Sequence, residues 1–555
     1  MTSAPRLRGA ARREYRRLSR ATGMPSRTHP LVTLTPSIPV AADDGAELLT
    51  DHWHAEGAGG QTLLIRTPYG RDGVAGVARF FAERGHHVVV QSCRGTFGSG
   101  GSFSPLHDEV ADGQATLRWV RGQSWATDRV HSWGGSYFGV TQWAYCDGEA
   151  RPDTMGIAIS ARRFDDAILY PGGGFSIDTP LTWAYALDMQ ERSLPRRIWA
   201  LLRARWAILR GARATPPGDA VRVAAHSDPQ FFRDWVDHSD QGDPWWHPLR
   251  FASDVDTIPP VTLMAGWQDL FLVGQLADYA ALKEADRSVR LIVGDWTHGD
   301  HETTAIGVRE ALAAFAGAGK GADVRLEISG GAGWHEFDQW PPPSTAVFRE
   351  FTADGRLALP AAERRAAALS YRYDPADPTP DAGGRTLNPF SAGRRDQRVR
   401  ERRDDVLVFT DDVLEKDLVV IGQPEVELTF ASSNPRADVF IRLCEVDPKG
   451  RSRTITDVYR RLPDDAAPNE PRRVRLPLAP IAHRFAAGSR LRVQVSSGAH
   501  PLHLRNPGTA DPVRDHSQLI GSDQVVHVGG ATPALLVLPA FDASGAPAVH
   551  LPVAR

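Results

Sequence analysis

The chain has 555 residues, which is longer than one hydrophobic core usually organises, so we expect about three structural units. Its 42% of apolar and 24% of charged residues are typical of globular proteins and exclude a largely disordered chain. The formal net charge of -3 gives no overall electrostatic reason to expect a nucleic acid or an anionic membrane as partner. The composition therefore favours a small or neutral ligand.

The cysteines and the hydropathy pattern bear on location. Cys93, Cys146 and Cys444 lie far apart in the sequence, lack the spacing of metal ligands and cannot all pair within the chain. This usage favours the reducing cytoplasm. No run of about 18 apolar residues occurs, so the sequence predicts no membrane span.

Residues 1–30 are expected to form a basic N-terminal arm. The arm carries seven arginines by residue 20 but lacks the apolar stretch of a secretory signal. Leu7, Ala11, Tyr15 and Leu18 would share one face of a short helix. Two interpretations stay open, a surface-binding arm and a solvated or loosely docked segment of the kind common at chain termini.

Short apolar runs alternate with helical patterns between residues 31 and 160. Strands that alternate with helices need crossover connections, which produce a mostly parallel sheet covered on both faces. The sequence therefore predicts an α/β layer. The expected strands are Gln61–Ile65, His87–Gln91, Arg129–Ser132 and Met155–Ser160, and the expected helices are Val74–Glu83, Asp108–Val120 and Tyr137–Tyr145.

The pattern changes to helices and tryptophan-rich loops over residues 161–250, which we interpret as an inserted helical cap. Strand signals resume at Pro260–Ala265 and Val289–Val293, with a helical stretch at Val273–Lys283 between them. Residues 251–345 should therefore complete the first sheet.

A second boundary is expected near residue 345. Trp340 is followed by three prolines, and all fifteen tryptophans lie at or before Trp340. The remaining residues, 346–555, contain alternating polar and apolar stretches with Gly and Pro turns, which predict an all-β domain of jelly-roll type. The clearest expected strands are Val406–Thr410, Pro424–Phe430, Val439–Val446 and Arg490–Ser496.

The most informative local motif surrounds Ser136. Here a strand signal runs into a helix signal through Gly134 and Gly135, a turn that can expose a serine hydroxyl above the carboxyl edge of a sheet. The spacing is G-x-S-x-x-G, because Phe138 stands where the second glycine of the usual G-x-S-x-G motif would be. Glycine near serine is common in turns, so this candidate nucleophile needs partners.

A serine hydroxyl needs a base, and a histidine base needs a carboxylate to orient it. Asp269 and His298 follow Ser136 in the chain order that this type of fold requires, and each lies just past an apolar strand signal. Asp269 could instead be a helix N-cap before Phe271. His298 could be an ordinary loop histidine, and the pattern His298 to Glu302 only weakly resembles a metal site because glycine and aspartate interrupt it.

These residues resemble the CocE/NonD hydrolases, a family related to cocaine esterase, α-amino-acid ester hydrolases and X-Pro dipeptidyl peptidases. The resemblance covers nearly all of residues 31–555. It rests on Arg66-Thr67-Pro68-Tyr69, the loop from Arg94-Gly95 to Gly100, Gly135 to Trp143, Gly266-Trp267-Gln268-Asp269 and Gly294-Asp295-Trp296-Thr297-His298, with Asp405 to Thr410 and Arg505-Asn506-Pro507 in the tail.

The resemblance implies an α/β-hydrolase domain with an inserted helical cap and a C-terminal all-β jelly roll like that of X-Pro dipeptidyl peptidases. It also implies that Ser136 is the nucleophile, His298 the base and Asp269 its orienting partner. The hydroxyl of Tyr69 and the backbone N–H of Tyr137 would form the oxyanion hole. A phenol stays protonated at neutral pH, so Tyr69 can donate a hydrogen bond, although it could also be an ordinary aromatic turn residue.

The expected substrate is a small ester or amide with a neutral or aromatic acyl group. The resemblance suggests Phe175, Trp183 and Phe271 as side chains that face the substrate, and ordinary core packing is the alternative. Leu270 and Phe271 follow Asp269 where an α-amino-acid ester hydrolase would want carboxylates, which argues against a charged α-amine.

The sequence leaves several functions open. An X-Pro dipeptidyl peptidase would need an anionic anchor that the sequence does not reveal, and an acyltransferase could use the same residues with another acceptor. A non-catalytic module that binds carbohydrate through the jelly roll would make the ordered Ser, Asp and His a coincidence. We expect a serine hydrolase, most simply a carboxylic ester hydrolase, with no cofactor, no metal and no nucleic acid partner. The β domain could close the site or scaffold a homo-oligomer.

Overall fold

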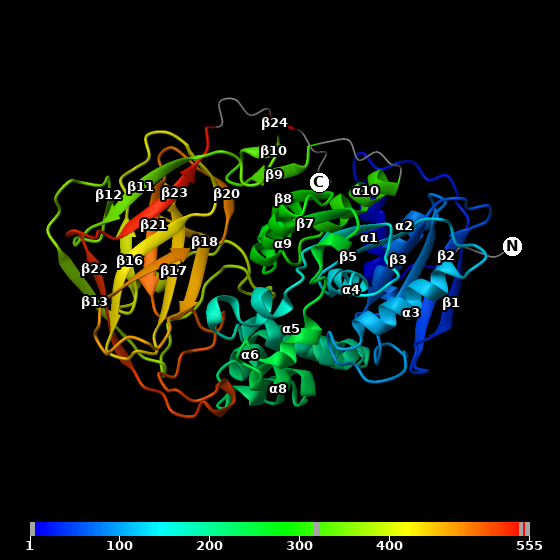
Figure 1. Cartoon of the computed structure of the whole chain (residues 1–555), viewed down its shortest axis with the longest axis horizontal. Coiled ribbons are helices and arrows are strands. Elements are labelled where there is room, and N and C mark those ends of the chain that lie inside the picture. The colour runs from blue at the N-terminus through cyan, green and yellow to red at the C-terminus, as the bar shows by residue number, and fades with distance from the viewer. Residues whose placement is uncertain (1–5, 316–321, 543–547, 550–555) are drawn as a thin grey trace.

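The computed structural model describes residues 6–315, 322–542 and 548–549. Figure 1 shows an α/β body next to an all-β body, with a group of helices below the central sheet. The chain begins in the α/β body, passes into the helical group, returns to the sheet and then forms the all-β body. This architecture confirms the predicted fold class.

The α/β body is built on a sheet in which eleven of the described strands pair. Its order is β1-β2-β4-β3-β5-β6-β7-β8-β9-β10-β24. The strands from β4 to β9 in this order run parallel, while β1 and β2 at one edge and β10 and β24 at the other pair antiparallel. The bounds are β1 (Val32–Ala41), β2 (Glu47–Ala55), β3 (Thr62–Thr67), β4 (His87–Ser92), β5 (Val130–Gly135), β6 (Thr154–Ala158), β7 (Val261–Gln268), β8 (Val289–Thr297), β9 (Val324–Ile328), β10 (Gly333–Phe337) and β24 (Ala548–Val549).

Helices cover both faces of this sheet. Leu63 and Val88 face α2 and α10, whereas their neighbours Leu64 and Val89 face α3 on the other side. Every residue of β3 and β4 is buried, as expected for strands enclosed between two helical layers. The helices are α2 (Arg71–Ala82), α3 (Glu109–Arg121), α4 (Tyr137–Tyr145), α9 (Leu272–Glu284) and α10 (Glu302–Phe315).

The predicted arm contains the helix α1 (Gly9–Arg20), which is docked on the α/β body. Ala11 and Leu18 are buried, and the Tyr15 hydroxyl donates a 2.6 Å hydrogen bond to Glu83. The backbone of α1 comes so close to α2 that a Cβ at Gly76 would lie 2.4 Å from the Ala11 carbonyl oxygen. The apolar face of α1 is therefore used inside the molecule, and its arginines remain outside.

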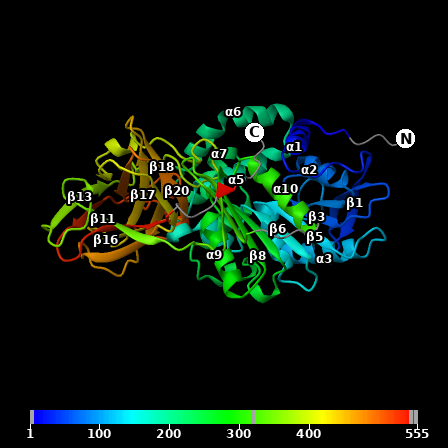
Figure 2. The same cartoon turned by 90° about the horizontal axis from the view of Figure 1, so that it is seen from above.

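The insertion between β6 and β7 is helical, which agrees with the predicted cap. It contains α5 (Asp178–Gln190), α6 (Leu194–Gly211), α7 (Ala220–Ala225) and α8 (Gln230–Asp237), joined by short 3-10 and π-helical turns. In the view from above, α6 and α1 lie on the same side of the molecule (Figure 2). The cap contributes Trp183, Trp235 and Trp246 to the largest apolar core of the described chain.

The all-β body consists of two antiparallel sheets packed around one apolar core. Its location after residue 345 agrees with the expected domain order. The strands are β11 (Thr345–Phe351), β12 (Leu357–Ala358), β13 (Ala367–Tyr373), β14 (Leu407–Thr410), β15 (Leu418–Gly422), β16 (Glu425–Ser432), β17 (Asp438–Val446), β18 (Ser452–Arg461), β19 (Arg472–Pro477), β20 (Ile481–Phe485), β21 (Arg490–Ser496), β22 (Ser522–Val528) and β23 (Leu535–Ala540).

The tail does not remain entirely within the all-β body. After β23, the two residues of β24 pair with β10 at the edge of the α/β sheet. Trp334 and His335 of β10 are the partners of Val549 and Ala548. The expected all-β domain of residues 346–555 therefore does not include β24. An exposed sheet edge offers backbone hydrogen bonds to any strand that reaches it.

Candidate active site

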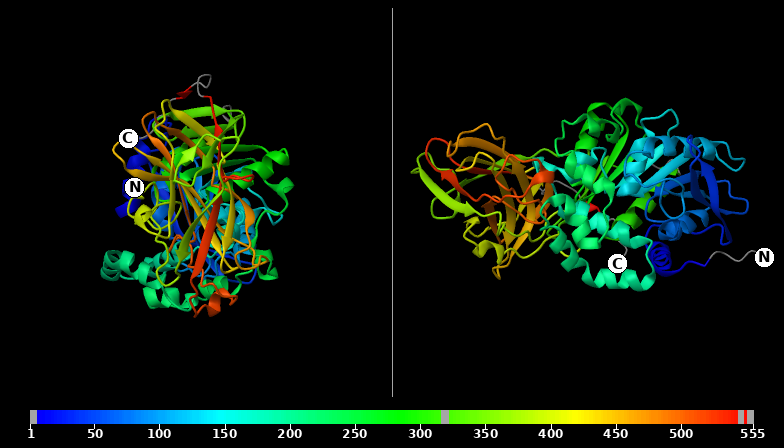
Figure 3. Two further views of the ribbon diagram at one scale, coloured as in Figure 1. Left: turned by 90° about the vertical axis from the view of Figure 1, so that its left-hand side faces the viewer. Right: turned by 90° about the horizontal axis from the view of Figure 1, so that it is seen from below.

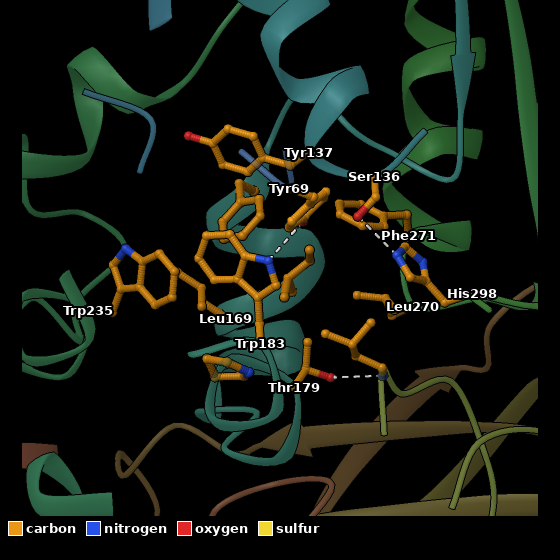
Figure 4. Close-up of a pocket in the computed structure, with 14 residues that line it drawn as sticks. Tyr69, Ser136, Tyr137, Leu169, Thr179, Trp183, Trp235, Leu270, Phe271 and His298 are labelled. Carbon is orange, nitrogen blue, oxygen red and sulfur yellow. Dashed lines mark hydrogen bonds between the residues drawn. The ribbon is translucent and has the colours of Figure 1, made fainter. Parts of the chain in front are cut away.

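Ser136 lies in a strained turn between β5 and α4. Its φ of 58° and ψ of -130° are rarely adopted by a residue with a side chain. The turn is held from below, because the Ser136 N–H lies 3.0 Å from the carbonyl oxygen of Ala158 and 3.1 Å from that of Ile159. Ser136 directly follows β5, so its side chain lies at the carboxyl end of that strand, with the hydroxyl next to His298 (Figure 4).

Phe138 accounts for the unusual glycine spacing. A Cβ at Gly134, where φ is 156°, would lie 2.4 Å from the Phe138 Cβ, so the two positions are in tight contact. A Cβ at Gly139 would lie 2.4 Å from the side chain of Ser160, so close packing of helix against strand occurs one residue later than in the usual motif. The sequence therefore departs from G-x-S-x-G only in the position of the second glycine, which is Gly139, and the turn at Ser136 is retained.

His298 connects Ser136 to Asp269. Its Nε2 lies 2.9 Å from the Ser136 hydroxyl oxygen, and its Nδ1 lies 2.6 Å from Asp269 Oδ2. Asp269 is fully buried, and the His298 side chain is 11% exposed. Three side chains from separate stretches of the chain thus form one hydrogen-bonded series, with the imidazole between a hydroxyl and a carboxylate (Figure 4).

Asp269 uses both of its carboxylate oxygens. While Oδ2 contacts the imidazole, Oδ1 accepts a 2.8 Å hydrogen bond from the N–H of Phe271, just before α9. Asp269 is not the helix N-cap that the sequence offered as an alternative, because Phe271 occupies that position; its contact stabilises the turn before α9 and fixes the carboxylate relative to His298. The ring of Phe271 lies 5.8 Å from the imidazole, so it shields this pair from solvent.

Tyr69 approaches the serine from the end of β3. Its hydroxyl accepts a 2.8 Å hydrogen bond from the indole N–H of Trp183 on α5. Burial raises the pKa of Tyr69 to about 12, while hydrogen bonds with Trp183 and Ser136 oppose the shift. The phenol therefore stays protonated near neutral pH, and because its oxygen already has a donor, its own hydrogen can point toward the serine (Figure 4).

Tyr137 directs its side chain away from Ser136 (Figure 4). Its hydroxyl donates a 2.9 Å hydrogen bond to Glu109 and accepts one of 2.8 Å from the Leu106 N–H. Glu109 also pairs with the buried Arg66 at 2.8 Å. This buried network, which sequence reasoning missed, anchors the first residue of α4, where a backbone N–H has no acceptor within its own helix.

A small cavity of about 30 Å³ lies beside the Ser136 hydroxyl. Trp183 and Phe271 line this cavity, as the sequence predicted. Aliphatic and aromatic side chains dominate its walls, so it suits an uncharged group. The residues around it are Tyr69, Ser136, Tyr137, Phe164, Ile168, Leu169, Thr179, Pro180, Trp183, Trp235, Leu270, Phe271, His298 and Leu387.

Phe175 does not line this cavity. Its side chain is fully buried, with its ring 5.2 Å from that of Tyr170 and 6.0 Å from that of Phe232. The structure thus contradicts the predicted substrate contact and favours core packing. The sequence could not separate the two, since both environments select a buried aromatic residue.

A much larger cleft of about 860 Å³ opens on the other side of Ser136 and His298. Tyr69, Trp183 and Leu387 border both the cleft and the small cavity. Its apolar walls come from α2, α5 and α6, and α1 contributes Arg13 and Arg17. The nucleophile therefore stands at the junction of a narrow cavity and a much larger cleft.

The all-β body contributes to the site through residues 386–390. Asp178, buried at the start of α5, accepts hydrogen bonds of 2.7 Å from Thr386 and 2.8 Å from Asn388. Leu387, between these two donors, borders both spaces. Sequence reasoning missed this connection because its partners lie more than 200 residues apart.

Within the described ranges, no group of three or more His, Cys, Asp or Glu side chains is arranged to hold a metal ion. None of the described helices is long and apolar enough to cross a bilayer.

Comparisons with known proteins bear on the family and the fold of this chain. Residues 44–300 match the X-Pro dipeptidyl-peptidase (S15) family, and residues 316–537 match the X-Pro dipeptidyl-peptidase C-terminal non-catalytic domain. Cocaine esterase from Rhodococcus sp. (strain MB1 Bresler) is 28% identical over 569 residues, an alignment that covers 91% of this chain and 98% of the esterase. The chain belongs to the CocE/NonD family of serine hydrolases.

Solved structures support the fold of this CocE/NonD hydrolase. An aminopeptidase from a marine sediment archaeon, a thaumarchaeon, superposes with a TM-score of 0.77 at 22% identity, covering 94% of this chain and 99% of that one. An α-amino acid ester hydrolase superposes with a TM-score of 0.76 at 21% identity, with the same coverage. At this identity the likeness concerns the fold.

Proposed function

We propose that this CocE/NonD hydrolase cleaves carboxylic esters through an acyl-enzyme formed on Ser136. In the first half-reaction, the Ser136 oxygen attacks the ester carbonyl carbon while His298 Nε2 takes the hydroxyl proton. The tetrahedral intermediate collapses, the carbon–oxygen bond to the alcohol breaks, and His298 gives the proton to the leaving alcohol. Water then repeats the sequence and releases the acid.

The observation that carries this proposal is the hydrogen-bonded series from Ser136 through His298 to Asp269, with distances of 2.9 and 2.6 Å. In this arrangement Asp269 would hold the Nδ1 proton on the side of the carboxylate, leaving Nε2 free to accept the serine proton. A buried carboxylate in direct contact also stabilises the imidazolium that forms during the reaction.

We assign the oxyanion hole to the hydroxyl of Tyr69 and the backbone N–H of Tyr137. Support for Tyr69 comes from its raised pKa and from Trp183, which donates to the phenolic oxygen and leaves the phenolic hydrogen available. Support for Tyr137 comes from its position in the first turn of α4, directly after the nucleophile. Two donors aimed at one oxygen stabilise the charge that develops in the transition state.

The two spaces around Ser136 suggest how a substrate is divided. We assign a small, neutral acyl group to the narrow cavity, where Trp183 and Phe271 provide apolar contacts. The wide cleft would receive the alcohol side of the ester, because about 860 Å³ accommodates a group much larger than the acyl part. The all-β body, which we take to be a jelly roll, would close one wall through Leu387.

Amide cleavage is the second candidate, because the matched family is described by an X-Pro dipeptidyl-peptidase. Such a peptidase must hold a charged N-terminal amine near the nucleophile. No Asp or Glu side chain is among the described residues that border the narrow cavity. We therefore rank neutral esters above X-Pro peptides, and water above an alcohol or amine as acyl acceptor.

The proposed setting is the cytoplasm. Cys93, Cys146 and Cys444 are all buried and unpaired. Burial raises the pKa of Cys146 and of Cys444 to about 12, so neither readily forms the thiolate needed for disulfide exchange.

A panel of substrates tests the proposal. Aryl and alkyl esters with short neutral acyl groups, aminoacyl esters and Xaa-Pro amides are to be compared by kcat/KM, with Ser136→Ala as the control for background hydrolysis. We expect the neutral esters to be preferred and the variant to lose activity with all of them. Selective cleavage of Xaa-Pro amides would reverse the ranking, and undiminished turnover by the variant would exclude Ser136 as the nucleophile.

A further inference from the structure

The cap helix α6 has an apolar surface on its outer side. Ala200, Ala204 and Ala207 face inward and are buried. On the outer side Leu202 is 82% exposed and Leu201 is 72% exposed. Exposed large apolar side chains are unusual when they gather on one helix. The full set is Leu194, Ile198, Trp199, Leu201, Leu202, Trp206 and Leu209.

Arginines flank this apolar surface. Arg196, Arg203 and Arg210 recur every seven residues, so they form one stripe along the helix. Arg203 lies over the rings of Trp199 and Trp206, at 4.5 and 5.1 Å from the ring centroids. All five arginines of α6 are exposed, and α6 contains no Asp or Glu.

The helix α1 adds positive charge beside this surface. Seven exposed arginines occur between residues 6 and 20, and the only acidic residue of α1 is Glu14. Both helices border the wide cleft, α1 through Arg13 and Arg17 and α6 through Arg197 and Leu201. They lie on the same side of the body in two views, with α6 projecting outward (Figures 2 and 3).

The charges decide between two occupants for this surface. In a symmetric dimer built on α6, the same helix from a second copy would bring five arginines against five arginines with no acidic partner in either helix. An anionic lipid surface supplies the missing negative charge and an apolar layer together. Tryptophan at the boundary and arginine that extends toward headgroups are typical of helices that lie in that interface.

We propose that α6 and α1 form a docking surface for an anionic lipid bilayer, with α6 lying in the interface and the α1 arginines against the headgroups. Docking would turn the opening of the wide cleft toward the lipid. Given the hydrolase activity proposed above, on which only this last step rests, an ester dissolved in the bilayer could reach Ser136 without crossing water.

Vesicle binding tests the docking surface without any catalysis. Ser136→Ala protein is to be sedimented with vesicles of phosphatidylcholine alone and with vesicles that also contain phosphatidylglycerol. We expect binding to the anionic vesicles, weakened by salt, and little binding to the neutral ones. The double substitution Leu202→Glu/Leu209→Glu on the same background should reduce binding by roughly tenfold or more, because it places charge in the apolar surface.

A matched control separates this effect from general surface charge. Leu359→Glu/Val399→Glu makes the same chemical change at two exposed positions of the all-β body, 70% and 76% exposed, and should leave vesicle binding unchanged. Circular dichroism of each variant verifies that the fold is retained.

Three results would overturn the proposal: no preference for anionic vesicles, equal binding by the α6 variant, or a concentration-dependent dimer that the α6 variant loses while vesicles are not bound. The third result would show that the α6 surface binds a second copy of the chain. Because these measurements use the inactive protein, they are independent of the substrate panel. A hydrolase that cleaves dissolved esters but binds no vesicles would leave the proposed function intact and refute only the docking surface.

Discussion

At the scale of single residues, the role proposed for the hydroxyl of Tyr69 gives the sharpest predictions. It has one donor, the indole of Trp183, and lies within hydrogen-bonding reach of Ser136. A neutral donor in a buried site interacts with a developing oxyanion more strongly than water does, because little competing solvent is present.

Tyr69→Phe should therefore lower kcat by about 10²–10³ with a smaller effect on KM, since the interaction forms mainly in the transition state. Hydrolysis of a short-chain p-nitrophenyl ester measures this. An unchanged kcat would remove Tyr69 from the oxyanion hole.

Trp183→Phe tests the support of Tyr69 by its neighbour. The variant keeps an aromatic ring in the cavity but removes the N–H that contacts the phenolic oxygen. One neutral hydrogen bond contributes about 1 kcal/mol, so kcat should fall by roughly fivefold. In the Tyr69→Phe background the same substitution should have almost no further effect on kcat. Independent, multiplying losses would show that Trp183 acts without Tyr69.

The sequence identified residues well where chemistry restricts the choice and less well where packing decides. Ser136, Asp269 and His298 each follow a strand signal, and the structure brings them together. Phe175 was wrongly assigned because an aromatic side chain carries no sign of which cavity it faces. Glu109 was missed because its partner is a hydroxyl that points away from the site.

At the scale of elements, the cap and the all-β body are joined at Asp178. The carboxylate is buried and its pKa is raised by desolvation, an effect that the hydrogen bonds from Asn388 and Thr386 oppose. These two donors fix residues 386–390, which border the site, against the first turn of α5.

Asp178→Ala should destabilise the protein by about 1–3 kcal/mol, because two buried donors lose their acceptor. Leu387 would then be held less firmly, so KM should rise more than kcat falls. Denaturant unfolding and ester kinetics measure the two effects. Asp237→Ala, at the exposed end of α8, is the control and should change stability by less than about 0.5 kcal/mol. Equal effects of the two substitutions would show that Asp178 does not join the bodies.

The interior strands were predictable, whereas the edges of the sheet were not. The runs that became β3, β4, β7 and β8 are apolar because helices cover both faces. β1 is largely exposed, so its residues give a weaker signal, and β24 joins the sheet from more than 200 residues beyond β10. Antiparallel additions at an edge depend on which segment reaches it, a property that local patterns do not encode.

At the scale of the whole molecule, the net charge of -3 conceals an uneven distribution. The net charge averages over the whole chain and so conceals the proposed anionic-membrane site, whereas residues 6–20 and α6 together place twelve exposed arginines on one side. The apolar face predicted for the N-terminal arm was confirmed, although it packs on α2 and leaves only the charged face outside. The arrangement of charge, which requires the fold, therefore says more about partners than its sum.

Buried histidines should make the fold sensitive to acid. Burial lowers the pKa of His52 to about 3 and those of His131 and His500 to about 4, from an ordinary value of 6.5. In this pH range the histidines bind protons in the unfolded chain but stay neutral in the folded chain. The free energy of unfolding should therefore fall as the pH drops from about 6.5 toward 4. Buried carboxylates work in the opposite direction, because burial raises the pKa of Asp381 to about 6 and also raises the pKa values of Glu109, Asp178 and Asp278. Burial lowers the pKa values of His86 and His516 to about 4 and that of His503 to about 3, and we expect the combined histidine effect to dominate.

Thermal unfolding at pH 7.5 and at pH 5 measures this effect, with the ionic strength held constant. We expect a lower Tm at the acidic pH. A Tm that is unchanged or higher there would show that the histidines are not kept neutral by the fold.

The central claim is that Ser136 is the residue that becomes acylated, and mass spectrometry of a trapped intermediate tests it most directly. The protein is to be mixed with an aryl ester, quenched with acid and digested, and compared with Ser136→Ala and His298→Ala. We predict an acyl group on the peptide that contains Ser136, its absence from the first variant, and strongly slowed formation in the second. Acylation of another residue, or equal acylation of the Ser136→Ala protein, would contradict the account.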